Sequence, residues 1–153
     1  MRFTRKTIVL AALVGGLFVA GVATAAWLGT GAGSGSAKAT SFQDLTVSGG
    51  TATAELYPGA SNQHLFLHIV NPNPFAVTVT AVKNGAGSIT PDGGHASCTT
   101  TGVTFTNQTS LSIAVAANSS TDTSVNGVSM DNTSSTGCQG ATFTVPVTVD
   151  ATS

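Results

Sequence analysis

The side chains that could do chemistry in this sequence are few: three histidines, two cysteines and six acidic residues. The histidines are His64, His68 and His95, and each would need an activated hydroxyl or thiol beside it to act as a general base. Because Ser and Thr are abundant throughout the chain, a neighbouring hydroxyl carries no information. On an extended strand His64 and His68 would share a face about 13 Å apart, too far to bind one metal ion without further ligands. We therefore expect no catalytic site, no metal site and no cofactor.

Two further groups of charged and polar residues could have a chemical role. Asp122, Asn126, Asp131 and Asn132 could offer oxygen ligands to calcium, but their spacing is not that of an EF-hand, and turn or cap roles are favoured for these residue types.

Lys38 and Asp150, near the two ends of the predicted domain, could form an isopeptide bond with Glu55 as a proton shuttle. Ordinary solvated charges are the favoured alternative for these three residues.

Cys98 and Cys138 are the only cysteines. An even pair in a small exported domain most often closes a disulfide, so we expect one here. The loop-closure model gives about 3.9 kcal/mol for a ring of about 40 residues, as an upper figure. The alternative is a redox or metal-binding thiol pair, but the spacing is neither that of a CxxC motif nor that of a zinc site.

The start of the chain has the composition of a Sec signal peptide. Three basic residues come first: Arg2, Arg5 and Lys6. An apolar run follows over residues 8–22, and Ala23 and Ala25 supply the small side chains that predict cleavage after Ala25. The alternative is an uncleaved anchor, because the apolar run approaches the length of a minimal membrane span. Either way we expect an extracellular or cell-surface protein, in contact with a membrane only through an uncleaved signal segment.

The charge of the remaining chain excludes one class of partner. Beyond residue 25 it keeps two lysines, no arginine and six acidic residues, a net formal charge of −4. Such a chain cannot neutralise a row of phosphates, which supplies most of the affinity for nucleic acid. We exclude nucleic acid and a basic membrane-binding surface.

The rest of the sequence divides into a tether and one domain. Residues 26–36 read AWLGTGAGSGS and predict a Gly/Ser-rich tether, and residues 37–153 form the predicted domain. Apolar and polar residues alternate there in short segments separated by Gly, Asn, Pro and Asp, which is typical of antiparallel strands with one covered face. About eight strands are expected: 42–47, 51–57, 63–71, 76–83, 102–107, 111–116, 121–129 and 141–150. This pattern favours an all-β, two-sheet antiparallel sandwich of immunoglobulin-like topology, with a small jelly roll or barrel as the alternative.

Three details of the predicted strands can be checked directly. Pro146 cannot donate a ladder hydrogen bond, so the last strand should lie at an edge or carry a bulge. The alternation changes phase around Gly127, which predicts a bulge there. Pro58 and Gly59 predict a turn, and residues 71–74 (NPNP) predict a rigid connection between two strands.

Three stretches of the sequence together carry a resemblance to a known group of proteins. They are LYPG at 56–59, VNPNP at 70–74 and CQGATFTVP at 138–146. The chain resembles a family of small secreted actinobacterial proteins, which implies an exported immunoglobulin-like sandwich and little about its ligand. More distantly, Ala26-Trp27 after the signal is similar to the start of camelysin and TasA-like subunits of matrix fibres.

One strand predicts an apolar patch on the outside of the domain. If Leu65, Leu67 and Ile69 fill the core, the pleat places Phe66 and Val70 on the opposite face, where they could form a small docking patch.

The chain that could dock there is Ala26-Trp27-Leu28, although Trp27 and Leu28 could equally be remnants of the signal. Together these patterns favour a secreted or cell-surface structural or binding module without catalytic activity. Its partner would be an unknown surface or matrix component, or another copy. A self-assembling matrix or fibre subunit is the alternative, and an extracellular hydrolase is disfavoured because the acidic residues are scattered rather than paired.

Overall fold

The computed structural model describes residues 32–153. The chain divides into two compact units, residues 1–38 and residues 39–153. In the first unit, residues 32–38 form neither helix nor strand. The predicted signal segment, its cleavage residues Ala23 and Ala25, and the predicted docking residues Trp27 and Leu28 lie outside the described residues. From residue 32 onward, the structure has no helix that is both long and apolar enough to cross a membrane.

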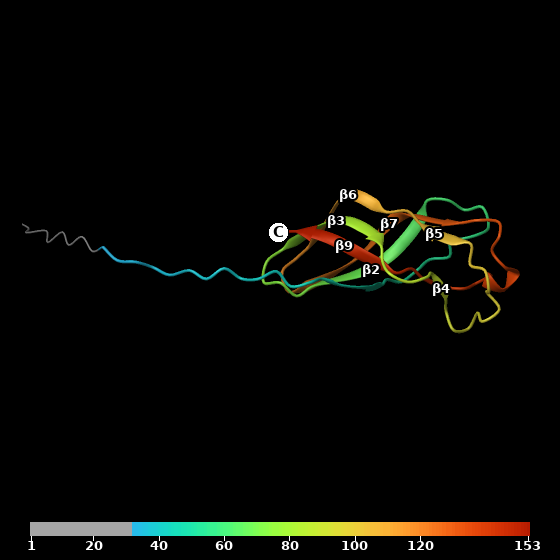
Figure 1. Ribbon diagram of the computed structural model, residues 1–153, viewed down its shortest axis with the longest axis horizontal. Helices are drawn as coiled ribbons and strands as arrows, with labels where there is room; N and C mark the ends of the chain where they lie inside the picture. The colour runs from blue at the N-terminus through green and yellow to red at the C-terminus, as the bar shows by residue number, and fades with distance from the viewer. Residues whose placement is uncertain (1–31) are drawn as a thin grey trace, which may run out of the picture. The chain divides into compact units, whose positions relative to one another are not determined.

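The second unit is built from strands with one short 3-10 turn (Figure 1). In chain order the elements are β1 (Thr46–Gly49), β2 (Gln63–Asn71), β3 (Val77–Asn84), β4 (Thr90–Pro91), β5 (Val103–Phe105), β6 (Gln108–Val115), β7 (Ser119–Met130), η1 (Thr136–Cys138), β8 (Phe143–Thr144) and β9 (Val147–Thr152).

The strands form two main antiparallel sheets, which confirms the predicted sandwich. One sheet has the order β1-β2-β7-β5 and the other has the order β6-β3-β9, while β4 and β8 form a separate small pair. The first order corresponds to strands A, B, E and D of an immunoglobulin-like domain, and β3 pairs with β9 as strand C pairs with strand F. Within the described residues, no strand takes the place of strand G beside β9.

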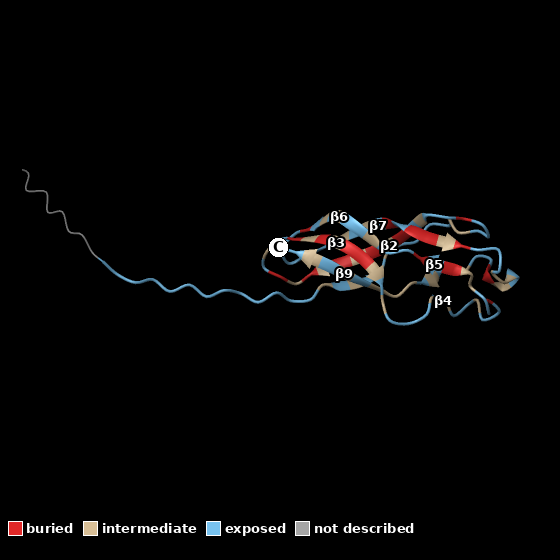
Figure 2. Ribbon diagram, turned by 45° about the horizontal axis from the view of Figure 1, so that its top comes forward, coloured by how far each residue is buried: buried red, intermediate tan, exposed pale blue. Residues whose placement is uncertain are grey.

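The core lies between the two sheets, where the inward residues of the central strands meet (Figure 2). Leu67 and Ile69 of β2 are 2% and 0% exposed, and Val79 and Val82 of β3 are both 0% exposed. Burying a side chain of this size stabilises the fold by about 1.5 to 3 kcal/mol. The alternation predicted for β2 therefore places the expected residues in the core, whereas in β3 a register shift between Val79 and Ala81 interrupts the alternation and Val82 is buried as well.

Asn71 and Asn73 are completely buried, although the NPNP segment was expected to act only as a rigid connection. Asn71 Nδ2 donates to the carbonyl oxygens of Phe75, Val115 and Ala116, and Asn71 Oδ1 accepts from the backbone and side-chain amides of Asn73. These bonds satisfy polar groups that would be costly to bury alone. The two asparagines thus form a buried hydrogen-bonded network at this end of the sandwich.

The segment 51–57 is not a strand, contrary to the prediction. Ala52 and Ala54, which alternate along the predicted strand, are exposed. Alanine has a low strand propensity and little apolar area to bury, so its alternation is a weak signal. This segment belongs to the long loop of residues 50–62 between β1 and β2.

The strands predicted at 42–47 and 141–150 are shorter in the structure. β1 begins only at Thr46, because the backbone of Gln43 pairs with the side chain of Asn73 rather than with a strand. The last segment is split into β8 and β9 at Val145 and Pro146. Pro146 has no N–H to donate, and β9 is an edge strand, as predicted.

Two other sequence predictions concern local backbone geometry. Between β2 and β7, His64 lies opposite two residues, Asn126 and Gly127, so the predicted bulge at Gly127 is confirmed. Gly127 has a φ of 115°, a conformation that favours glycine. The predicted turn at Pro58 and Gly59 is confirmed by the hydrogen bond from Ala60 N to Tyr57 O at 2.8 Å.

Cys98 and Cys138 form the predicted disulfide. It links the loop after β4 to η1, across a separation of 40 residues, and both cysteines are buried. Such a bond indicates an oxidising environment.

Candidate functional site

A groove opens along one side of the sandwich, where the two sheets part. It has a volume of about 960 Å³ and lies between β1 with its following loop and the segment 141–148. Its apolar walls include Leu56, Leu65, Leu67, Phe143, Val145 and Val147. An apolar cleft of this size is a common feature of binding sites.

The groove exists because the three-stranded sheet ends at its edge strand, β9. The three-stranded sheet faces a sheet of four strands, which extends further. The inward residues Val79 and Val82 on β3 are fully buried, whereas Val147 and Val149 on β9 point inward but remain half-buried. The core is therefore left partly uncovered along β9.

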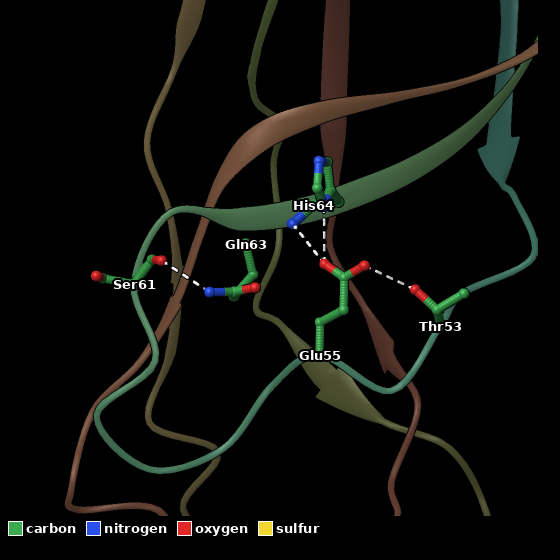
Figure 3. Close-up of polar contacts among 5 residues, drawn as sticks. All are labelled: Thr53, Glu55, Ser61, Gln63 and His64. Atoms are coloured by element: carbon green, nitrogen blue, oxygen red, sulfur yellow. Dashed lines mark hydrogen bonds and ion pairs between the residues drawn. The ribbon is translucent and has the colours of Figure 1, made fainter.

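One acid–histidine pair lies at the edge of the groove (Figure 3). Glu55 comes from the β1–β2 loop, and His64 is the second residue of β2. Glu55 Oε2 lies 2.8 Å from His64 Nδ1 and accepts the backbone N–H of His64 at 3.3 Å, while Glu55 Oε1 accepts the hydroxyl of Thr53 at 2.8 Å. The turn at Pro58 and Gly59 reverses the chain between the two residues and brings them together.

These contacts keep Glu55 negatively charged. The hydrogen bond from His64 is the main cause that lowers the pKa of Glu55, and the hydroxyl of Thr53 adds to it. Among the groove-lining residues of the described chain, Glu55 has the only carboxylate. The groove is therefore apolar with one anionic group at its edge.

A histidine held by a carboxylate is also the orienting half of many hydrolytic sites. Such a site needs a nucleophile at the other ring nitrogen. In the described part of the chain, His64 Nε2 makes no hydrogen bond, and the ring lies beside Phe66 with 6.0 Å between centroids. The pair thus lacks the third group that nucleophilic catalysis requires.

The other two histidines are paired in the same way but lie elsewhere. His68 Nδ1 lies 2.7 Å from Asp122 Oδ1, across the β2–β7 pair in which the two residues are directly opposite. His95 Nδ1 lies 2.8 Å from Asp92 Oδ1 in the loop after β4. None of these acid–histidine pairs was predicted from the sequence. The register of β2 with β7, which would have revealed one of them, is not evident from the sequence.

Asp92 has the most strongly shifted carboxyl of the described residues. The hydrogen bond from His95 lowers the pKa of Asp92 to about 2, and the backbone N–H groups of Thr142 and Gly94 contribute. Thr142 N donates to Asp92 Oδ2 at 2.6 Å. Asp92 therefore joins the loop after β4 to the start of the C-terminal segment.

The structure separates the residues considered for calcium binding. Asp122 lies near the start of β7, and Asp131 follows its end, about 30 Å along the strand. Asp131 Oδ1 accepts the backbone N–H and hydroxyl of Thr133, as in a turn. From residue 32 to the C-terminus, no group of three or more His, Cys, Asp or Glu residues is placed to hold a metal ion.

Two of the residues considered for an isopeptide bond, Asp150 and Glu55, have other partners. Asp150 Oδ2 lies 2.5 Å from Lys83 Nζ, in a solvent-exposed ion pair between β9 and β3. The carboxylate of Glu55 is held by His64 and Thr53. Glu55, the predicted proton shuttle, is therefore hydrogen-bonded to two residues that line the groove.

Phe66 and Val70 lie on the outer face of β2, as the pleat requires, and both are half-buried. The large apolar side chains that are exposed in the described residues are Phe42 and Tyr57. Tyr57 lines the groove and is 63% exposed. Sequence reasoning did not single it out, although its place before Pro58 marked it as a turn residue.

Fold and site together define a disulfide-linked antiparallel β-sandwich with an apolar groove at an open sheet edge. Comparison with protein-family models, curated proteins and solved structures finds no match to this chain.

Proposed function

We propose that this protein is exported by the Sec route, with cleavage after Ala25, and acts at the cell surface or outside the cell as a binding module without catalytic activity. The groove between β1 and segment 141–148 is the observation that carries this proposal. Its walls are apolar, and the one acid–histidine pair at its edge has no nucleophile beside it within the described residues. The Cys98–Cys138 disulfide supports export, because such bonds persist in oxidising compartments.

Export and cleavage are tested by intact-mass analysis of protein recovered from the culture medium or cell surface. We expect a mass that corresponds to a chain starting at Ala26 with an intact disulfide. Recovery of full-length protein in the cytoplasm, or detection of two free thiols in the native protein, would contradict the export proposal.

Ligand binding in the groove is tested with an apolar fluorescent dye of the anilinonaphthalene type. We expect the exported protein to bind the dye, and Ala141→Trp, which adds an indole to the groove wall, to reduce binding. Ala114→Trp is the matched control, because Ala114 is exposed on β6 and does not line the groove. Equal dye binding by both variants, or no binding by the parent protein, would count against the groove as a binding site.

The absence of catalysis needs its own assay. We expect no turnover of common ester, peptide or glycoside substrates. An activity that is abolished by His64→Ala, His68→Ala or His95→Ala would replace the binding module with a hydrolase.

A self-assembling matrix or fibre subunit is the second candidate, favoured by the edges of β1 and β9 that have no strand partner among residues 32–153. Unpaired sheet edges are templates for another chain. In this alternative Trp27 and Leu28 of one copy would dock on Phe66 and Val70 of another, and deletion of residues 26–36 would leave a folded monomer. A monomeric elution of the exported protein at high concentration in size-exclusion chromatography would exclude assembly.

A further inference from the structure

The groove borders the outer edges of two successive strands, β8 and β9. β8 pairs with β4 and β9 pairs with β3, each on one side only. In the described chain, the opposite edge of β8 and β9 has no strand partner, and residues 143–148 of this edge line the groove. Unpaired backbone N–H and C=O groups at such an edge are best satisfied by the backbone of another extended segment.

The apolar groups beside this edge have the period of a strand. Phe143, Val145, Val147 and Val149 alternate along the chain, point inward and are only half-buried. A segment added next to them would place every second side chain over the same uncovered core. An apolar small molecule could fill the volume, but it would leave the backbone edge unpaired.

The charge at the groove restricts the occupant further. The whole chain beyond residue 25 is acidic, and Glu55 is kept ionised by His64 and Thr53. The groove lining contains no lysine or arginine to offset this charge. A positively charged group on the occupant would complement it.

We propose that the groove binds an extended peptide, which adds as a strand to the free edge of β8 and β9. Alternate apolar side chains of the peptide enter the groove, and a basic residue or free amino terminus lies against Glu55. This inference rests on the proposed function of the groove as a binding site and names its ligand class. About five to six peptide residues span an edge of this length.

The test is calorimetric titration of the exported protein with a short synthetic peptide, a lysine followed by alternating valine and threonine. Three control peptides each remove one feature: a glutamate replaces the lysine, the valines are grouped instead of alternating, or alternate backbone nitrogens are methylated. We expect the parent peptide to bind and backbone methylation to weaken binding at least about tenfold, because it blocks strand pairing.

Two protein variants test whether the negative charge of Glu55 contributes to peptide binding. Glu55→Gln should weaken binding of the lysine peptide about three- to fivefold, the size expected for a partly exposed ion pair, and leave binding of a neutral analogue unchanged. Asp122→Asn is the matched control, because Asp122 also pairs with a histidine but lies on the outer face of the sandwich, and it should have no effect.

The outcomes distinguish this inference from the proposed function. If the dye binds in the groove but the peptide does not, or if methylated and unmethylated peptides bind equally, peptide addition is wrong while the groove remains a binding site. Failure of both ligands overturns the two proposals together. If the exported protein is an oligomer that the peptide cannot dissociate, the occupant is a second copy, and the free peptide is not the ligand.

Discussion

The side chain of Asn73 holds the backbone of Gln43 as a neighbouring strand would. Asn73 Nδ2 donates to Gln43 O at 2.8 Å, and Asn73 Oδ1 accepts from Gln43 N at 2.7 Å. The rings of Phe42 and Phe75 lie beside this contact, with centroids 6.2 Å apart. The segment before β1 is thereby fastened to the loop between β2 and β3.

We predict that Asn73→Ala lowers the free energy of unfolding by about 2 to 3 kcal/mol, because it removes the side-chain hydrogen bonds to the backbone of Gln43 and to the buried side chain of Asn71. Urea denaturation measures this change, and hydrogen exchange should show faster exchange at Gln43. The control is Asn126→Ala, since Asn126 is exposed. Equal stability of the two variants would show that the contact contributes nothing.

Loss of the Cys98–Cys138 disulfide should also lower the free energy of unfolding. Cys98→Ala removes the closure of a loop with a separation of 40 residues. We expect the free energy of unfolding to fall by about 2 to 4 kcal/mol. Denaturation of the oxidised parent protein in parallel with the variant gives the value, and an unchanged urea midpoint would contradict it.

Gly127→Ala should destabilise the bulge in β7. Alanine would have to adopt a φ of 115°, and its Cβ would approach Thr106 O to 2.7 Å. We expect a loss of about 1 to 3 kcal/mol, read from thermal denaturation. Gly49→Ala is the control, because a Cβ at Gly49 has no atom within 4 Å. A variant at Gly127 as stable as this control would show that the bulge tolerates a side chain.

Acid should destabilise the protein partly through Asp92. The folded-state pKa of about 2 lies below the ordinary value of 3.8, so ionised Asp92 stabilises the fold above that ordinary value. This contribution is lost as the pH falls from about 4 to about 2, because the unfolded state then takes up the proton first.

Asp92→Asn should therefore flatten the dependence of the urea midpoint on pH in this range. Asp122→Asn is the comparison, since Asp122 also pairs with a histidine but lies on β7. Identical pH profiles for the parent protein and Asp92→Asn would refute a role for this carboxylate.

Strong side-chain alternation allowed much of the fold to be predicted. Leu65, Leu67 and Ile69 carry enough apolar area that only one register buries them, and β2 has the predicted bounds. Ala52 and Ala54 show the same period with little area, and the loop that contains them is not a strand. The two-residue period thus predicted a strand correctly where the alternating apolar side chains were large.

The candidate site was much harder to predict, because it depends on contacts between distant segments. The Glu55–His64 pair requires the turn at Pro58, which was predicted, but also the path of a loop that was taken for a strand. The groove depends on which strand ends the second sheet. Pro146 indicated that the last strand lies at an edge, but the order of the other strands is set by the packing of whole sheets.

The amino-acid sequence alone determined the all-β class, the core positions of β2, the cysteine pair and the glycine at the bulge. These depend on local properties: the two-residue period of a strand, the count of cysteines and the backbone freedom of glycine. Only the tertiary structure decided that Asn71 and Asn73 are buried and that Glu55 pairs with His64. An asparagine can be buried only where distant carbonyl and amide groups converge on it, and the acid–histidine pair depends on the path of the loop between the two residues.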